Sequence, residues 1–403
     1  MAFVPLKYNF RNLSVRWPTT LLTVMVSAIV VACSCVLFGL VDGLMYSQAV
    51  SGDPLTLLVM RKGADNETSS NFSIQTAQDL ATLKGIAQGR ARTAEEAQKG
   101  FPDLQDKPLI SGELLNIPVM SRSDGSRVNL TIRGATSASP YLRPKFEIVE
   151  GRYFNPGTRE CIVSRSLVSR FPGTRLGQQF RVSDKEVYNV VGIFTAGSSA
   201  AESEVWTGRE DLAANTNNDR SVSSTRIRAE DNRSLEALID SITNESRFGL
   251  LPKRESVYYQ SQNTTALFLT VIGTVIAVLL TIGALFAAAN TMFAAVKSRT
   301  REIGTMRALG FSRTAILMSF LLESVVITAV GGALGALVSL LFSNWSFGIS
   351  DFSSFSERVI QLRFGVLPFA VALGMTLAMG VFGGLFPAIR AVRLDVVKAL
   401  REL

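Results

Sequence analysis

The sequence predicts an α-helical membrane protein with four transmembrane helices and an α+β extracytoplasmic domain between the first and the second of them. Four long stretches of the 403-residue chain are apolar and almost free of charge. Each is long enough to cross a hydrocarbon core of about 30 Å at about 1.5 Å per residue. The first two stretches are separated by the long, more polar segment 46–255. Basic residues gather in three segments that four crossings would bring to one side of the membrane.

The net charge of +8 is unevenly distributed along the chain. The N-terminal segment, the segment between the second and third spans and the C-terminal tail together hold twelve basic and three acidic residues, whereas residues 46–262 hold 27 basic and 26 acidic residues. Cytoplasmic segments of membrane proteins are enriched in Lys and Arg. The distribution therefore predicts a multi-pass protein of the bacterial inner (cytoplasmic) membrane with both termini cytoplasmic. Its expected contact is with the lipid membrane, and no nucleic-acid partner is expected.

The individual segments follow from local patterns. Apolar residues alternate with Lys7, Arg11 and Arg16 at the start, which indicates an amphipathic elbow helix in the membrane interface. The segment 256–296 is uncharged and would be about 60 Å long as a helix, roughly twice the bilayer core. Its first part is polar, so one continuous helix rising out of the membrane as a stalk is predicted. The predicted segments are 1–18 (elbow helix), 19–45 (first span), 46–255 (outer domain), 256–296 (stalk and second span), 297–313 (cytoplasmic coupling segment), 314–343 (third span), 344–363 (short outer loop), 364–389 (fourth span) and 390–403 (cytoplasmic tail).

The outer segment combines short β-like runs, such as Leu55–Met60 and Val128–Arg133, with helical candidates such as Leu235–Thr243. This mixture predicts an α+β domain. No charged residues in it have the spacing of a catalytic pair. Glu202 and Glu204 lie two positions apart, so on a strand they would share one face, and we expect that face to be a solvated edge.

Catalysis and metal binding are not expected in this chain. It contains no histidine and three cysteines, of which Cys33 and Cys35 lie inside an apolar run. Ser-His-Asp triads and His-based zinc motifs are therefore excluded, and the cysteines form no disulfide framework.

Two features inside the predicted spans could have a packing role or a functional one. Glu323 lies about two turns into the third span, where a carboxylate could serve in a proton relay. We expect it instead to pair with an arginine of the coupling segment. Small residues recur at helical spacing in the third and fourth spans, where they allow helices to pack closely, within the subunit or across a dimer. These packing glycines are Gly331, Gly335, Gly380 and Gly384.

The segment between the second and third spans carries the most informative pattern. Ile303, Met306 and Leu309 recur at near-helical spacing. Gly310 suits a helix C-terminus, and Ser312 can cap the helix that follows. A short helix held at the membrane surface is well placed to dock a soluble partner. The residues alone leave a second interpretation open, in which this is a solvated loop whose arginines fix orientation.

The sequence of this segment, R-E-I-G-x-x-R-A-L-G from Arg301, closely resembles the coupling segment of the MacB/FtsX-type ABC transporter permeases. Two further stretches resemble the same family, namely Glu150–Phe154 in the outer domain and Pro387–Arg401 at the end of the chain. Val396 departs from the family pattern, which usually has proline there. The size of the outer domain favours the MacB-like branch.

The resemblance implies a permease subunit that couples ATP hydrolysis by a separate ATPase to periplasmic movements. These movements would drive export or extraction of a substrate by mechanotransmission. It also implies a second permease protomer, in a homo- or heterodimer, and allows a periplasmic membrane-fusion protein. No Gly-x-x-x-x-Gly-Lys-Ser/Thr phosphate loop occurs in the sequence, so this chain is expected to bind no cofactor, with ATP and Mg²⁺ held by the partner ATPase. The residues assigned to ATPase coupling are Arg301, Glu302, Ile303, Gly304, Met306, Arg307, Leu309 and Gly310.

Two alternative functions have no transported substrate. One is a membrane-anchored scaffold or signalling protein whose outer domain binds a partner. The other is an FtsX-like regulator of a cell-wall hydrolase. Neither is an enzyme, and binding of an ATPase separates the scaffold from the transporter.

Overall fold

A computed structural model describes residues 17–393 of the chain, except 246, 263, 344 and 351–355. The predicted elbow helix 1–18 and the predicted tail 390–403 lie largely outside these residues. The described chain forms two compact units, a helical unit and an α+β unit. The α+β unit is built from residues 44–267 together with 346–361, and the helical unit from the rest.

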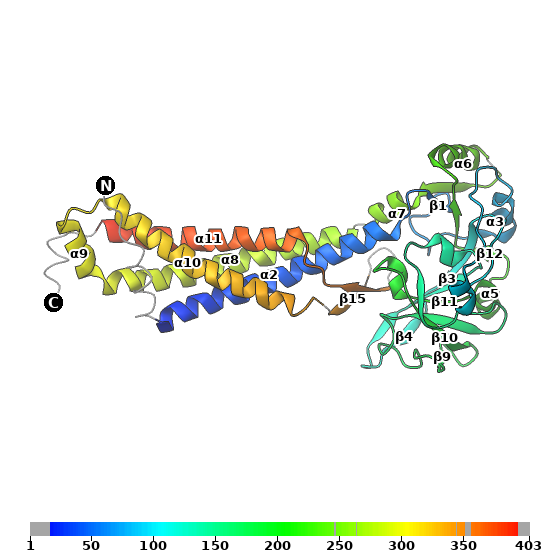
Figure 1. The fold of residues 1–403 in the computed structure, drawn as a ribbon, viewed down its shortest axis with the longest axis horizontal. Coiled ribbons are helices and arrows are strands. Elements are labelled where there is room, and N and C mark those ends of the chain that lie inside the picture. Colours follow the sequence, from blue (N-terminus) through cyan, green and yellow to red (C-terminus); the bar gives the residue numbers. More distant parts are fainter. Residues whose placement is uncertain (1–16, 246, 263, 344, 351–355, 394–403) are drawn as a thin grey trace. The chain divides into compact units, whose positions relative to one another are not determined.

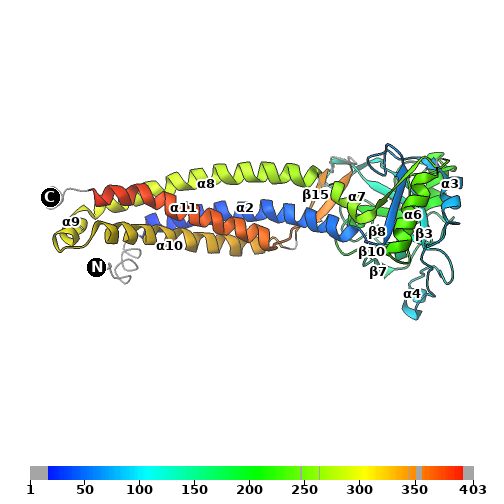
Figure 2. The ribbon, with the colours of Figure 1, turned by 90° about the horizontal axis from the view of Figure 1, so that it is seen from above.

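Four helices are long and apolar enough to cross a membrane, as predicted. They are α2 (Trp17–Ser51), α8 (Thr264–Ser298), α10 (Arg313–Leu340) and α11 (Val366–Val392). The short helix α9 (Thr300–Ala308) connects α8 to α10 (Figures 1 and 2). Trp17 and Pro18, which the sequence assigned to the elbow, are the first residues of α2. Proline fits there because the first turn of a helix needs no backbone N–H donor from it.

The glycines predicted to pack helices do so within this chain. A Cβ on Gly331 would come within 2.6 Å of the Val24 carbonyl oxygen on α2, and one on Gly384 within 2.6 Å of Ser324 Cβ on α10. A Cβ on Gly335 would overlap the carbonyl oxygen of Ala28 on α2. These positions therefore let α10 approach α2 and α11 at backbone distance.

The predicted stalk and second span are described in two parts, on either side of residue 263. The polar first part forms α7 (Glu255–Ser261), and Gln262 caps its C-terminus. The Gln262 side chain donates to the backbone carbonyl of Asp65 (3.0 Å), and the backbone carbonyl of Gln262 accepts from the side chain of Gln48 (3.2 Å). The polar residues of this stretch are thus packed into the α+β unit, because its polar groups offer them hydrogen-bond partners. Residue 263, between α7 and α8, lies outside the description.

The α+β unit contains one large mixed sheet. Its strand order is β14-β1-β13-β3-β6-β11-β8-β10-β7, with β9 also paired to β10. The pairs β6–β11 and β8–β10 are parallel, and the other pairs are antiparallel. The strands of this sheet are β1 (Thr56–Arg61), β3 (Ile110–Asn116), β6 (Thr131–Ala135), β7 (Glu147–Gly151), β8 (Glu160–Ser164), β9 (Gln179–Arg181), β10 (Val187–Thr195), β11 (Glu204–Gly208), β13 (Ser224–Arg228) and β14 (Leu250–Arg254).

Smaller elements cover this sheet or extend it. The helices are α3 (Ile74–Leu80), α4 (Ala94–Gln98), α5 (Arg209–Thr216), α6 (Asn232–Asn244) and the 3-10 turns η1 (Ser139–Leu142) and η2 (Ala200–Ser203). The remaining strands are the pairs β2 (Phe72–Ser73) with β12 (Ser221–Val222), β4 (Val119–Ser121) with β5 (Arg127–Asn129), and β15 (Ser346–Ser350) with β16 (Glu357–Gln361).

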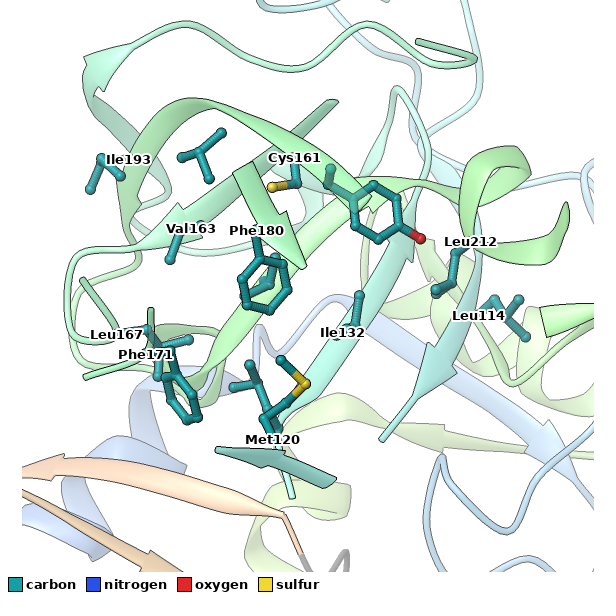
Figure 3. Packing of buried hydrophobic residues seen from close by; sticks show 14 of the residues in the cluster. Leu114, Met120, Ile132, Cys161, Val163, Leu167, Phe171, Phe180, Ile193 and Leu212 are labelled. Carbon is teal, nitrogen blue, oxygen red and sulfur yellow. The ribbon is translucent and has the colours of Figure 1, made fainter. Parts of the chain in front are cut away.

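Strand β1 is buried on both faces. Leu57 and Val59 join the cluster around α6, whereas Leu58 and Met60, which point the opposite way, pack with Tyr258 and Tyr259 of α7. Helix α7 is thereby fixed on one face of the sheet. A second core under α5 gathers aliphatic and aromatic side chains from β3, β6, β8, β9 and β10 (Figure 3).

The predicted short outer loop 344–363 is instead a β-hairpin that belongs to the α+β unit. Val359 lies in the core of that unit and donates its backbone N–H to Ser203 Oγ (2.8 Å). Glu357 forms ion pairs with Arg122 and Arg170. The segment is held as a hairpin because its backbone and its polar side chains find hydrogen-bond and ion-pair partners on the domain.

Candidate functional site

The turn that connects α9 to α10 has a capping motif at each end. At its C-terminus Gly310 has φ +92°, its N–H donates to the Arg307 carbonyl (3.2 Å), and the N–H of Phe311 donates to the Met306 carbonyl (3.1 Å). This pair of bonds is a Schellman motif, which needs a left-handed residue and so favours glycine. Ser312 Oγ then accepts from the N–H of Ala315 (3.1 Å) and caps α10, as predicted. The turn between α9 and α10 is therefore encoded locally.

The inner side of α9 is part of the helical unit's core, which corrects the prediction for Ile303. Its side chain is fully buried among residues of α8, α10 and α11, including Met292, Ile316 and Phe320. Gly304 is also buried, and Met306 packs against the same cluster. An apolar residue on a short helix between two spans can face either a partner or the bundle, and spacing alone does not separate the two. Ile303 stabilises the docking of α9 on α8, α10 and α11.

A buried ion pair fixes the start of α9 to the third span. Arg299 precedes the helix and donates through Nη1 to Glu323 Oε2 (2.9 Å) and through Nη2 to Glu323 Oε1 (3.2 Å). The side chains are only 6% and 5% exposed. Two parallel bonds between a guanidinium and a carboxylate fix orientation as well as distance. Arg299 is thus the arginine of the coupling segment that meets Glu323.

The outer side of α9 forms an exposed surface, which we call the coupling surface: Arg301, Glu302, Thr305, Ala308 and Leu309. Leu309 is 74% exposed, although it is a large apolar side chain. Arg307 is half-buried, and its Nε has no hydrogen-bond partner within the described chain. An apolar anchor surrounded by charged and polar groups is the usual composition of a protein-binding patch. The surface carries no group arranged for bond-making chemistry.

A second constellation, which the sequence did not predict, lies on the α7-covered face of the sheet. Four neighbouring strands place alternating charges there: Arg226 on β13, Glu113 on β3, Arg133 on β6 and Glu204 on β11. Glu67, Arg143 and Glu255 complete it. We call these seven residues the sheet network. Each is at most 7% exposed, which is rare for charged side chains and requires mutual pairing.

The contacts of the sheet network are short and shared. Arg133 donates through Nε and Nη2 to the two oxygens of Glu204, both at 2.6 Å. Arg226 Nη1 lies 2.6 Å from Glu113 Oε2 and 2.9 Å from Glu67 Oε1. Its Nε lies 2.9 Å from Glu255 Oε1. Because Glu255 is the first residue of α7, Arg226 ties the segment leading into α8 directly to the sheet.

The network determines the charge state of its acids. Burial by itself would raise the pKa of Glu113, but Arg143, Arg226 and Arg133 outweigh it and bring the pKa to about 2. Burial is likewise outweighed at Glu67, where Arg133 and Arg226 hold the pKa well below its usual range. At Glu255 burial prevails over Arg226 and raises the pKa. Four carboxylates face three guanidinium groups, and Glu255 takes up a proton more readily than Glu67 or Glu113.

The expectation that Glu202 and Glu204 form a solvated edge is wrong. They are 8% and 6% exposed, and β11 lies inside the sheet between β6 and β8. Glu202 accepts from Ser164 Oγ (2.7 Å) and from the N–H of Ala196 (2.7 Å). An alternating acidic pattern is equally typical of an edge strand and of a central strand with charged partners. Only the partners, such as Arg133 on another strand, distinguish the two.

A polar cavity of about 60 Å³ lies beside the sheet network. Its walls come from the sheet (Arg133, Glu204), from α7 (Tyr259) and from the hairpin (Glu357). It is large enough for a few water molecules. Next to it, the N–H of Ala200 donates to Ser51 Oγ (2.7 Å), the last residue of α2. Within the described chain, no group of three or more His, Cys, Asp or Glu residues could hold a metal ion.

Comparison with known families matches both units. The family described as MacB-like periplasmic core domain matches residues 20–245, and the family described as FtsX-like permease C-terminal matches residues 265–396. The coupling segment and the sheet network lie within or beside these matches.

Individual relatives agree with these families. The macrolide export ATP-binding/permease protein MacB of Pasteurella multocida is 25% identical over 369 residues, which is 86% of this chain and 55% of that protein. The MacB 2 protein of Aeromonas hydrophila is 35% identical over 146 residues, or 36% of this chain and 21% of that protein. The ABC transporter permease YknZ of Bacillus subtilis is 37% identical over 145 residues, or 34% of this chain and 32% of that protein. The chain thus spans between about a fifth and about half of these relatives' length.

Among solved structures, the periplasmic region of MacB from Actinobacillus actinomycetemcomitans aligns with a TM-score of 0.37 and 10% identity. The alignment covers 55% of this chain and 98% of that one. The two family matches, together with four apolar helices and an α+β domain between the first and second of them, establish that the chain belongs to the MacB/FtsX-like ABC transporter permeases.

Proposed function

We propose that this chain is the permease subunit of an ABC transporter that uses ATP hydrolysis by a separate ATPase to move its outer domain. The movement would drive export or extraction of a substrate by mechanotransmission. The observation that carries the proposal is the coupling surface. It presents Leu309 at 74% exposure on a helix that is otherwise anchored by Ile303 and by the Arg299–Glu323 pair.

The proposed path of movement starts at α9. A push on the coupling surface would act on α8 and α10 together, because the core around Ile303 draws on both helices and Glu323 lies on α10. Such rigid contacts transmit displacement, since packed interiors have low compressibility. In the chain α8 follows α7, whose Glu255 is tied to the sheet by Arg226. The hairpin lies between α10 and α11 in the chain, and its Glu357 is held by Arg122 and Arg170. Two routes would thus reach the outer domain.

The proposed orientation places α9 in the cytoplasm of a bacterial cell and the α+β unit outside its inner membrane. The twelve basic residues on one side and the near-neutral outer domain support it. ATP and Mg²⁺ would be bound by the partner ATPase, because the 403 residues contain no phosphate loop. A second permease protomer completes the proposed assembly, and a membrane-fusion protein is a further candidate partner.

The test is Leu309→Asp in the full chain. We expect the variant to fold and insert but to lose association with the P-loop ATPase that co-purifies with the parent, because a central apolar anchor contributes about 2 kcal/mol or more to an interface. Leu176→Asp, at an exposed leucine of the α+β unit, is the matched control and should retain the ATPase. Ile303→Asp should instead lower the folded yield, since that side chain is in the core.

Recovery of no P-loop ATPase with the parent chain would favour the scaffold alternative. An ATPase that still binds Leu309→Asp, with unchanged nucleotide hydrolysis, would contradict the proposed docking surface.

A further inference from the structure

A basic groove lies at the end of α8 and α11, beside the start of α9. Its cavity volume is about 440 Å³, and its lining includes Asn290, Phe293, Val296, Lys297, Thr300 and Arg390. The three contributing helices meet at this end of the helical unit (Figure 2). The groove is separate from the coupling surface, whose residues do not line it.

The charge of the basic groove is not compensated by any acidic residue in the described part of the chain. Lys297 and Arg390 are both exposed, no acidic residue lines the groove, and neither cation forms an ion pair in the described part of the chain. Lysine and arginine at helix C-termini interact favourably with the helix dipole, which accounts for one cation on each helix. That effect does not account for a hollow between them. The Arg390 guanidinium lies 5.8 Å from the Phe293 ring centre, a cation–π contact that orients it.

The groove has an apolar floor and a cationic rim at the end of two membrane-spanning helices. Phe293, Ala294 and Val296 form the apolar part. Lys297 is in the last turn of α8, and Arg390 is in the last turn of α11. Residues at the ends of transmembrane helices lie at the level of the lipid headgroups, where basic pockets between helices bind anionic lipids.

We propose that the basic groove binds the phosphate of an anionic phospholipid, with an acyl chain or glycerol over its apolar floor. The guanidinium of Arg390 suits bidentate phosphate contacts, and the ammonium of Lys297 adds a point charge. Asn290 and Thr300 supply polar groups at the rim. A zwitterionic lipid carries its own cation and gains less from this rim. The proposal does not depend on the identity of the ATPase or of the cargo.

The experiment titrates the full chain, in detergent, with phosphatidylglycerol or phosphatidylcholine and counts bound lipids by native mass spectrometry. We expect phosphatidylglycerol to be preferred. The double variant Lys297→Gln/Arg390→Gln should weaken phosphatidylglycerol binding about 25-fold, from about fivefold for each cation. The charge-matched control Arg313→Gln/Arg393→Gln changes two cations outside the groove and should bind as the parent does. The swap Lys297→Arg/Arg390→Lys should retain the preference, which separates charge from folding.

Two results would overturn the proposal: no preference for phosphatidylglycerol over phosphatidylcholine, or equal losses of lipid binding in the double variant and the charge-matched control. Competition by millimolar inorganic phosphate alone would assign the groove to a free anion and reject the lipid. Failure of the Leu309→Asp test would leave each of these outcomes unchanged, so the two proposals fail separately.

Discussion

Replacing Arg226 by methionine removes the cation at the centre of the sheet network. Arg226 is fully buried and forms ion pairs with Glu67, Glu113 and Glu255. Removing one partner of a buried ion pair typically costs about 3–5 kcal/mol, because the remaining charge is left without compensation. We expect Arg226→Met to lower the free energy of unfolding of the α+β unit by an amount in this range at neutral pH.

The destabilisation caused by Arg226→Met can also be estimated from proton linkage. Burial already raises the pKa of Glu255, and Arg226 is the largest influence that opposes it. Without Arg226, the folded variant should bind one more proton than the parent. At pH 7.5, protonating a carboxyl group with an unfolded pKa of about 4.3 costs about 4 kcal/mol, and at pH 5.5 it costs less than about 2 kcal/mol. A group whose folded pKa is raised contributes most below its unfolded pKa and loses that contribution as pH rises. The destabilisation should therefore shrink by about 3 kcal/mol between pH 7.5 and pH 5.5.

The assay follows Trp206 fluorescence during urea unfolding of the full chain in detergent. Trp206 is buried and donates through Nε1 to Glu204 (2.7 Å), so its emission reports on the sheet network. Trp17 and Trp345 are replaced by phenylalanine in every variant. The control is Arg165→Met, which breaks the exposed pair with Glu150 and should cost less than about 1 kcal/mol. A loss below 1 kcal/mol in Arg226→Met, or a loss that is the same at both pH values, would refute this reasoning.

Two further substitutions test the packing of each unit. Gly335→Leu should lower the thermal stability of the helical unit, with a cost of several kcal/mol, because the side chain would overlap the backbone of Ala28. The control in the melting measurement is Gly283→Leu, where a Cβ meets nothing within 4 Å. Equal melting temperatures of the two variants would argue against the close packing at Gly335. Glu357→Gln should increase the rate of amide hydrogen exchange in β15 and β16 by at least tenfold, since charge-assisted hydrogen bonds contribute about 1.5–3 kcal/mol. Exchange in β13 is the control and should stay unchanged. Unchanged exchange in the hairpin would show that Glu357 does not hold it.

The features predicted correctly from the sequence are those encoded over a few neighbouring residues or over a whole span. Gly310 and Ser312 determine the turn after α9 through local backbone bonds, and both were identified by position. The four spans follow from uninterrupted apolar composition. The MacB-like assignment followed from short motifs that match a family over most of the chain.

The structural features that the sequence did not predict depend on contacts between segments that are distant in the chain. Arg226 and Glu67 are 159 residues apart in sequence yet share hydrogen bonds. A strand containing one charged residue does not reveal whether that residue meets water or an opposite charge. For the same reason Ile303 was assigned to a partner contact, although the bundle covers it. The hairpin at 346–361 was missed because its partners, Arg122 and Arg170, lie on the domain.

The central claim is that nucleotide hydrolysis reaches the outer domain through α9. It is tested most directly by measuring the distance between spin labels at Asp124→Cys in two permease protomers reconstituted with the ATPase, with and without ATP and vanadate. Asp124 is exposed in the α+β unit, so labelling there should not disturb packing. The account predicts that trapping the nucleotide shifts this distance in the parent and leaves it unchanged in Leu309→Asp. An unchanged distance in the parent, or the same shift in Leu309→Asp, would contradict it.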